Sequence, residues 1–364
     1  MYDSMFRIPR ITHLLCAQVG AVAGLVVGGA LRVRKLYDDT LSQLGDAERD
    51  VAEERRRRQH RNRISKECDE ALLRFIASLQ TALDGSFRSI PESVLAIKEL
   101  RSARAAGNAS PEAEEAEKHL WDTLKVATFS KVVSAIISFN VLHLVLRVQL
   151  HLLGRRSFLD TSKSRAPGQE PLTMDDRGTF LSLTYNHLLG EGLKGLVTAV
   201  DRAATEVLVD CALASKLDCN ATFTLLDRIR ETVLAEGLVQ FVVPPEQLLN
   251  DVAPMVQSML DETWDIVESP AFANALAAAL EQSSSVLTEQ LRSTVFASSQ
   301  PPGASDEPSI VAKPLPSLLV QLKPARTIFA TESSRCIHAD ATRGLAEISA
   351  LMDAVFESVD SAST

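Results

Sequence analysis

The sequence has few of the features by which enzymes and nucleic-acid-binding proteins are recognised. It contains no G-x-x-x-x-G-K-[ST] phosphate-binding loop, no H-E-x-x-H metalloprotease motif and no G-x-S-x-G nucleophile elbow. The formal net charge is -9, which argues against a nucleic-acid partner because phosphate backbones bind positively charged surfaces. We therefore expect no enzymatic activity, no cofactor and no nucleic-acid binding.

Cysteine and histidine are scarce and dispersed. The five cysteines are odd in number and form no C-x-x-C pair, so they predict neither a disulfide framework nor a zinc site, as in a reducing cytosol. They are Cys16, Cys68, Cys211, Cys219 and Cys336. The nearest approaches to a metal-ligand pair are His143 with His151 and Cys336 with His338. We interpret the first pair as core histidines and the second as incidental.

Strand patterns are also missing, and aromatic residues make up only 5% of the chain. No sustained period-two alternation is present, so a sheet is not expected. The abundance of Ala, Leu and Glu instead predicts an all-α fold, an elongated bundle of long helices. Helices are expected at about 36–83, 112–153, 178–213, 220–238, 244–265, 270–297 and 340–358. Flexible loops are expected at about 84–112, 161–177 and 298–317.

The N-terminus carries a long apolar run over residues 11–31, which contains no Asp, Glu, Lys or Arg. About 20 apolar residues span the hydrocarbon core of a bilayer as a helix, so the run predicts a single membrane anchor. A cleaved secretory signal is the alternative, but its apolar region is typically only about 7–15 residues. Gly20, Gly24 and Gly28 have a spacing that would let a second helix approach closely, although glycine is common in membrane helices in general.

Basic residues follow the anchor directly. Arg32, Arg34 and Lys35 are expected to contact lipid headgroups, and they outnumber Arg7 and Arg10 on the other side. This excess predicts that the bulk of the chain faces the cytosol. The predicted organisation is an anchor with its basic flank at 1–35 and a cytosolic helical domain at 36–364.

Two further stretches could be taken for membrane-binding elements. The apolar run at 132–153 contains Asn140, His143 and Arg147, and a charge near the bilayer centre costs about 2.5–3.5 kcal/mol, so a buried bundle helix explains it better than a second span. The basic stretch at 53–63 could contact anionic lipids or act as a nuclear-localisation patch. A solvated helical face, partly neutralised by acids, is the interpretation we favour.

Three blocks of sequence resemble the peroxin-3 family. They are LWDTLKVATFS at 120–130, LVLRVQLHLLG at 144–154 with FLD at 158–160, and FLSLTYNHLLGEGLKGL at 180–196. Their order and spacing match the family, as does an N-terminal anchor followed by basic residues. The resemblance implies an all-α bundle on the cytosolic face of the peroxisomal membrane, with possible transit through the endoplasmic reticulum. It also implies a groove that docks the amphipathic N-terminal helix of peroxin-19, a chaperone that carries membrane-protein clients.

The resemblance places the docking contact on the helix that contains Trp121. Residues three and four apart share a helix face, which groups Trp121 with Glu117, Leu124, Lys125 and Thr128. Leu120 precedes the tryptophan and completes the predicted site. The alternative function is an organelle tether or peroxisome-inheritance adaptor without a cargo-docking role, and the alternative role of Trp121 is to cap the bundle core.

Overall fold

The computed structural model describes residues 9–106, 110–161, 171–245, 252–296, 312–322 and 336–357. The side chains of residues 9–41 lie outside that description. The chain divides into two compact units, residues 1–62 and residues 63–364.

The first unit is formed by helix α1, which spans Pro9–Ser86 and so also enters the second unit. The predicted anchor at 11–31 is helical in its backbone. Its side chains, and those of Arg32, Arg34 and Lys35, lie outside the described residues. In the basic stretch, Arg57 pairs with Glu53 at 2.9 Å and Arg61 pairs with Glu54 at 3.3 Å, so acidic residues on the same helix neutralise part of its charge.

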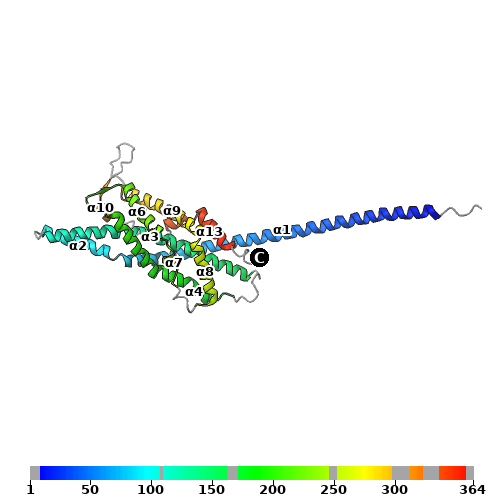
Figure 1. Cartoon of the computed structure of the whole chain (residues 1–364), viewed down its shortest axis with the longest axis horizontal. Coiled ribbons are helices and arrows are strands. Elements are labelled where there is room, and N and C mark those ends of the chain that lie inside the picture. The colour runs from blue at the N-terminus through cyan, green and yellow to red at the C-terminus, as the bar shows by residue number, and fades with distance from the viewer. Residues whose placement is uncertain are drawn as a thin grey trace, which may run out of the picture. The chain divides into compact units, whose positions relative to one another are not determined.

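The second unit is the helical bundle shown in Figure 1, and it confirms the predicted all-α fold. After α1 its helices are α2 (Ser89–Ala105), α3 (Pro111–Thr161), α4 (Met174–His187), the π-helical turn η1 (Leu188–Gly192), α5 (Leu193–Leu208), α6 (Cys219–Ala235), α7 (Val239–Val242), α8 (Pro254–Glu268), α9 (Pro270–Thr294), α10 (Leu315–Gln321), α12 (Ile337–Thr342) and α13 (Ala346–Glu357). The strands β1 (Lys216–Leu217) and β2 (Lys313–Pro314) form one short antiparallel pair.

Helix α3 is the central element of the bundle. Every residue from Ala127 through Gln149 is buried, because α2, α5, α6, α8, α9, α10 and α13 all pack against this helix. Among the residues whose side chains the structure describes, α3 alone is long and apolar enough to cross a bilayer, but 94% of its most apolar window is buried inside the protein. Helix α3 is apolar on all sides because it is the buried core helix of the bundle.

Two of the buried amide side chains of α3 have hydrogen-bond partners inside the bundle. Asn140 donates from Nδ2 to the Ile136 carbonyl at 2.8 Å and accepts from the Ser283 hydroxyl at 3.1 Å. Gln149 donates to the Thr184 hydroxyl at 2.8 Å. Buried polar groups are tolerated when such partners exist, so these residues connect α3 to α9 and α4 rather than mark a site.

Arg147 is the centre of a buried polar cluster. Its guanidinium donates to His143 Nε2 at 2.7 Å and to Asp69 Oδ1 at 2.7 Å. Asp69 also pairs with Arg343 at 2.9 Å, and the Thr342 hydroxyl lies 3.3 Å from His143 Nδ1. The cluster therefore holds α1, α3 and α12 together within the second unit.

Several predicted loop boundaries are wrong. The stretch 84–112 contains α2, because Pro91 falls in the first turn of that helix, where a missing N–H is tolerated. Thr173 caps α4 through a capping box with Asp176, so the predicted loop at 161–177 ends earlier. Residues 162–170 and 297–311 lie outside the described residues, and α10 begins at Leu315, inside the predicted loop 298–317.

Other helix boundaries also differ from the prediction. Helix α3 continues through Gly154 to Thr161, and Arg155 on this extension pairs with Glu262 of α8 at 2.6 Å. The helix expected at 244–265 begins at Pro254, with Pro in the first turn as is typical of a helix start. The last predicted helix is two helices, α12 and α13.

The glycines of the 180–196 block allow a close helix contact. Gly190 has non-helical dihedral angles (φ -97°, ψ -107°) inside η1, where the chain kinks between α4 and α5. A Cβ on Gly192 would lie 2.1 Å from the Phe241 carbonyl oxygen, and one on Gly195 would lie 3.1 Å from the Phe241 ring. Glycine at 192 is thus required by the approach of α7.

We expect Gly192→Ala to lower the free energy of unfolding by about 1–3 kcal/mol, because the new methyl group overlaps a backbone oxygen that cannot rotate away. Gly178→Ala is the matched control, since its Cβ would meet nothing within 4 Å on α4 and alanine favours a helix by about 0.5–1 kcal/mol. Chemical denaturation of the full chain in detergent, followed by circular dichroism, compares the two. Equal effects of both substitutions would contradict the packing argument.

Candidate functional site

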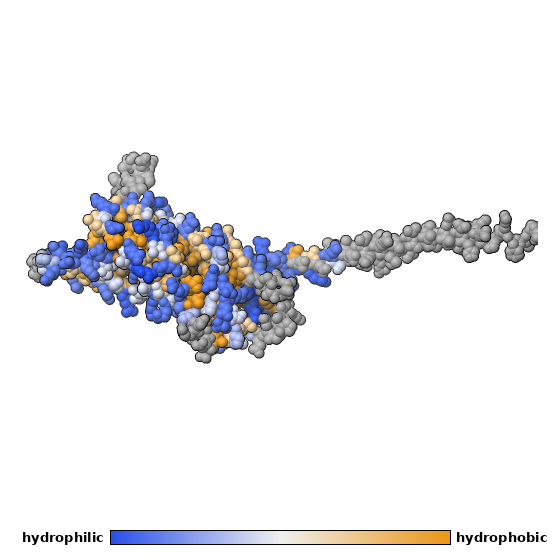
Figure 2. Space-filling model, in the orientation of Figure 1, coloured by the Kyte–Doolittle hydropathy of each residue, from blue (hydrophilic) through white to orange (hydrophobic). Residues whose placement is uncertain are grey.

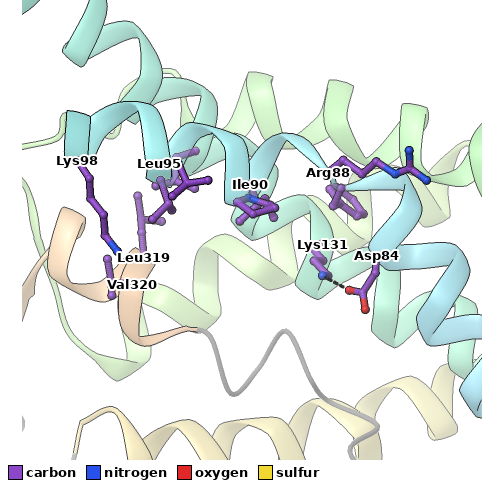
Figure 3. Close-up of a pocket in the computed structure, with 12 residues that line it drawn as sticks. Asp84, Arg88, Ile90, Leu95, Lys98, Lys131, Leu319 and Val320 are labelled. Atoms are coloured by element: carbon purple, nitrogen blue, oxygen red, sulfur yellow. Dashed lines mark hydrogen bonds and ion pairs between the residues drawn. The ribbon is translucent and has the colours of Figure 1, made fainter. Parts of the chain in front are cut away.

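A cavity of about 660 Å³ opens between α2, α3 and α10 (Figure 3). We call it the α2–α10 groove. It is lined by Asp84, Phe87, Arg88, Ile90, Pro91, Val94, Leu95, Lys98, Leu124, Lys131, Leu319 and Val320. Most of these residues are apolar, and a cavity of this size with a few charged residues at its edge is typical of a binding site.

Two helices present the apolar walls of the groove. On α2, Ile90 is buried and Leu95 is 59% exposed. On α10, Leu319 is buried and Val320 is 54% exposed. Figure 2 shows hydrophobic surface over α10, bordered by hydrophilic residues. Exposed apolar residues that gather in a hollow, rather than singly, indicate a surface that another molecule covers.

The short strand pair holds α10 in place. Lys216 and Leu217 pair with Pro314 and Lys313, and the backbone N–H of Leu315 donates to the Ser215 carbonyl at 2.9 Å. The apolar residues of α10 follow the helical spacing i, i+3, i+4, i+7, and all four are at most 1% exposed: they are Leu315, Leu318, Leu319 and Leu322. Helix α10, one wall of the groove, is therefore packed firmly against the bundle.

Trp121 of α3 lies in a cluster that joins α2 to α3. Its indole N–H donates to Glu117 Oε1 at 3.4 Å, and the same oxygen accepts from Arg101 Nε at 2.9 Å. The Arg101 guanidinium lies 5.1 Å from the centre of the Trp121 ring, a cation–π distance. Arg104 pairs with the other Glu117 oxygen at 3.1 Å. The hydrogen bond from Arg101 lowers the pKa of Glu117 most, despite opposing burial.

The predicted site residues are only partly brought together. Leu124 lines the groove, and Trp121 is 8% exposed beside it on α3. Lys125 donates to the Cys211 carbonyl at 2.9 Å and pairs with Asp122, so its charge is held within the bundle. Thr128 is fully buried and Leu120 is half-buried. In the described structure, then, Leu124 contributes directly to the groove, while Glu117 and Trp121 connect α3 to α2.

The groove residues on α2 and α10 were not predicted from the sequence. Leu95 and Lys98 fall inside the stretch 84–112, which was expected to be a loop, and Leu319 and Val320 follow a proline-rich segment. The spacing of Leu315, Leu318, Leu319 and Leu322 was a usable signal for α10, because it is that of an amphipathic helix. No local pattern shows that α10 lies opposite α2.

Other candidate chemistry has no supporting geometry in the part of the chain that the structure describes. No group of three or more His, Cys, Asp or Glu side chains could hold a metal ion there. Both histidines of the predicted pair are buried: His143 accepts from Arg147, and His151 Nδ1 lies 2.7 Å from the Arg147 carbonyl. Burial raises the pKa of the Cys68 thiol to about 12, so it is a poor nucleophile.

The glycines of the kink match a nucleotide-binding spacing by chance. Gly190, Gly192 and Gly195 have the spacing G-x-G-x-x-G. In a dinucleotide-binding fold that motif follows a strand, whereas here it follows helix α4. The close approach of α7 explains two of the glycines.

Comparison with known proteins identifies relatives along most of the chain. The model of the Peroxin-3 family matches residues 39–356. Peroxisomal biogenesis factor 3 of Mus musculus is 25% identical over 291 residues, which cover 74% of each chain. The protein of that name from Homo sapiens is 25% identical over 292 residues, again 74% of each. Peroxisome biogenesis protein 3-2 of Arabidopsis thaliana is 23% identical over 353 residues, covering 91% of this chain and 93% of its own.

Proposed function

Since this chain belongs to the peroxin-3 family, whose relatives are named as peroxisomal biogenesis factors, we propose that it acts in peroxisome biogenesis as a docking receptor for peroxin-19. In this role the α2–α10 groove receives the amphipathic N-terminal helix of peroxin-19. The receptor thereby brings membrane-protein clients to the peroxisomal membrane for insertion. The role requires no chemistry, only a groove and an attachment to the membrane.

The observation that carries the proposal is the exposed apolar groove on a rigid bundle. An amphipathic helix binds by placing side chains at i, i+3, i+4 and i+7 into a hydrophobic groove. Leu95 and Val320 stand exposed on opposite walls, and Leu124 lies between α2 and α10. A receptor that changes little on binding pays little conformational entropy, which favours affinity.

Trp121 supports the groove in this proposal. Because it is 8% exposed and covered by Arg101, its large ring fixes the spacing of α2 and α3. Direct contact with the partner would require Arg101 to move aside. Glu117 and Lys125 then position the α3 face rather than bind peroxin-19 themselves.

The anchor completes the proposed role. The apolar run at 11–31 would hold the chain in the peroxisomal membrane in a single pass, with Arg32, Arg34 and Lys35 at the headgroups. The bundle would then face the cytosol, where a soluble chaperone can reach the groove.

We expect Leu95→Glu to weaken peroxin-19 binding by about tenfold or more, because a buried carboxylate would replace an apolar contact in the groove. The measurement is a calorimetric titration of the full chain in detergent with purified peroxin-19. Leu95 is 59% exposed in the free protein, so the substitution leaves the fold intact.

Met174→Glu is the matched control for this experiment. Met174 is 80% exposed at the start of α4 and does not line the groove, so this variant should bind as the wild type does. Trp121→Ala is a weaker test, because truncating a buried tryptophan costs about 3–5 kcal/mol of stability. Equal affinity of the Leu95 variant and the wild type would place the docking surface elsewhere.

A further inference from the structure

The charged residues that line the groove are mainly cations, although the whole chain carries a net charge of -9. They are Asp84, Arg88, Lys98 and Lys131. Lys131 is ion-paired with Asp84, so these two charges cancel. Arg88 and Lys98 are both exposed, and the described structure gives neither of them an ion pair. Two uncompensated positive charges thus remain at the edge of an apolar hollow.

Lys98 crosses the mouth of the groove. Figure 3 shows its side chain extending from α2 toward Leu319 and Val320 on α10. A lysine stem packs well on apolar surface while its ammonium group stays in water. An occupant of the groove would therefore meet the ammonium group directly beside the apolar contacts of α10.

Arg88 marks the other end of the same wall. It precedes α2 by one residue and lies ten residues before Lys98, so the two are separated by about 15 Å along a helix axis at about 1.5 Å per residue. The acidic residues Glu92 and Glu99 are exposed on α2 but do not line the groove. An elongated occupant lying along α2 would meet one cation near each end.

We propose that the α2–α10 groove selects an amphipathic helix with an acidic residue at each end of its apolar stripe, through Lys98 and Arg88 as specificity-determining residues. The two acidic residues would be about ten positions apart, since parallel helices share the same rise per residue. Charged residues at the edge of an interface fix the register and reject partners of the wrong sign. The identity of the occupant as peroxin-19 rests on the proposed function, but the charge selectivity does not.

The shape of the site favours a helix over a lipid surface. The apolar residues lie in a hollow between two helices, which a planar bilayer surface does not enter. An anionic lipid surface shares the charge of the proposed occupant, so the experiment includes it as a competitor.

The test uses two synthetic helical peptides with the same apolar stripe. One carries glutamate at both ends of the stripe, ten positions apart, and the other carries lysine at those positions. Binding of each to the full chain in neutral detergent is measured by fluorescence anisotropy at low and high salt. We expect the glutamate peptide to bind about tenfold tighter at low salt, with a smaller difference at high salt because the charges are partly exposed.

Variants of the cations then assign the selectivity to residues. Lys98→Met keeps the aliphatic stem and removes the charge, so it should weaken binding of the glutamate peptide about twofold to fivefold. Lys98→Glu should make the lysine peptide the tighter binder. Arg88→Glu should likewise weaken binding of the glutamate peptide relative to the lysine peptide. Arg228→Glu, an exposed change on α6 away from the groove, is the control for net charge.

Three results would overturn the inference. They are equal binding of the two peptides, unchanged binding by the Lys98 and Arg88 variants, and displacement of the glutamate peptide by micelles doped with phosphatidylserine. The proposed function fails separately, when the wild-type chain binds the glutamate peptide but not peroxin-19.

Discussion

Arg147→Ala is expected to lower the free energy of unfolding by about 3–5 kcal/mol. Arg147 is 4% exposed and donates to both His143 and Asp69, so alanine leaves a cavity and removes a donor from the buried His143 and from the partly buried Asp69. The loss of a large buried side chain and the loss of the buried partner of an ion pair together account for a cost of this size. Chemical denaturation of the full chain in detergent gives the value.

Two further substitutions separate the charge from the packing. Arg343→Ala removes the other, half-exposed partner of Asp69 and should cost less than about 1 kcal/mol, as is usual for exposed ion pairs. Arg147→Met keeps much of the volume, so it should be less damaging than alanine. If the Arg147 and Arg343 alanine variants were equally stable, the buried cluster would not be the joint between α1, α3 and α12.

Lowering the pH from 6.5 to 5 is expected to destabilise the bundle by about 3 kcal/mol. Burial, with the nearby positive charges of Arg147 and Arg343, lowers the pKa of His143 from 6.5 to about 3. Burial lowers the pKa of His338 to about 4. As the pH falls below 6.5, the unfolded chain binds protons that the folded chain does not. Each histidine therefore removes about 1.5 kcal/mol between pH 6.5 and pH 5, and the loss continues until the folded pKa is reached.

The pH dependence has a residue-specific control. His143→Gln with His338→Gln should flatten the stability profile between pH 6.5 and 5, even if the double variant is less stable overall. His119→Gln, on the exposed surface of α3, should leave the slope as it is. Histidine carbon shifts in a selectively labelled wild-type chain provide a second measurement. Protonation of both buried rings near pH 6.5 would contradict the prediction.

The groove shows why a docking site is harder to predict than a fold. Trp121, Leu124 and Lys125 share a stretch of α3 in the sequence, and the local spacing groups them correctly on one helix. Only the neighbours of that helix decide their roles. Leu124 faces α2 and α10, Lys125 donates to the carbonyl of Cys211 in the segment that follows α5, and Trp121 is covered by Arg101.

The two walls of the groove illustrate the same limit. Leu95 and Val320 are more than two hundred residues apart in sequence, and each by itself is an ordinary exposed apolar residue. They form one surface because Lys216 and Leu217 pair with Pro314 and Lys313, respectively, which brings α10 to the bundle. Pairing between distant segments depends on the whole packing arrangement, and no periodicity in either segment encodes it.

The sequence by itself determined the class of the fold, the core character of α3 and the family. The family was indicated by the resemblance of three sequence blocks. The fold class and the core character of α3 follow from local composition and spacing: an apolar helix that carries Asn140, Arg147 and Gln149 must lie in a protein interior, where such groups find partners. The tertiary structure decided where the helices begin and end, and which residues line the groove. It did so because caps, close glycine contacts and the position of α10 depend on atoms contributed by distant parts of the chain.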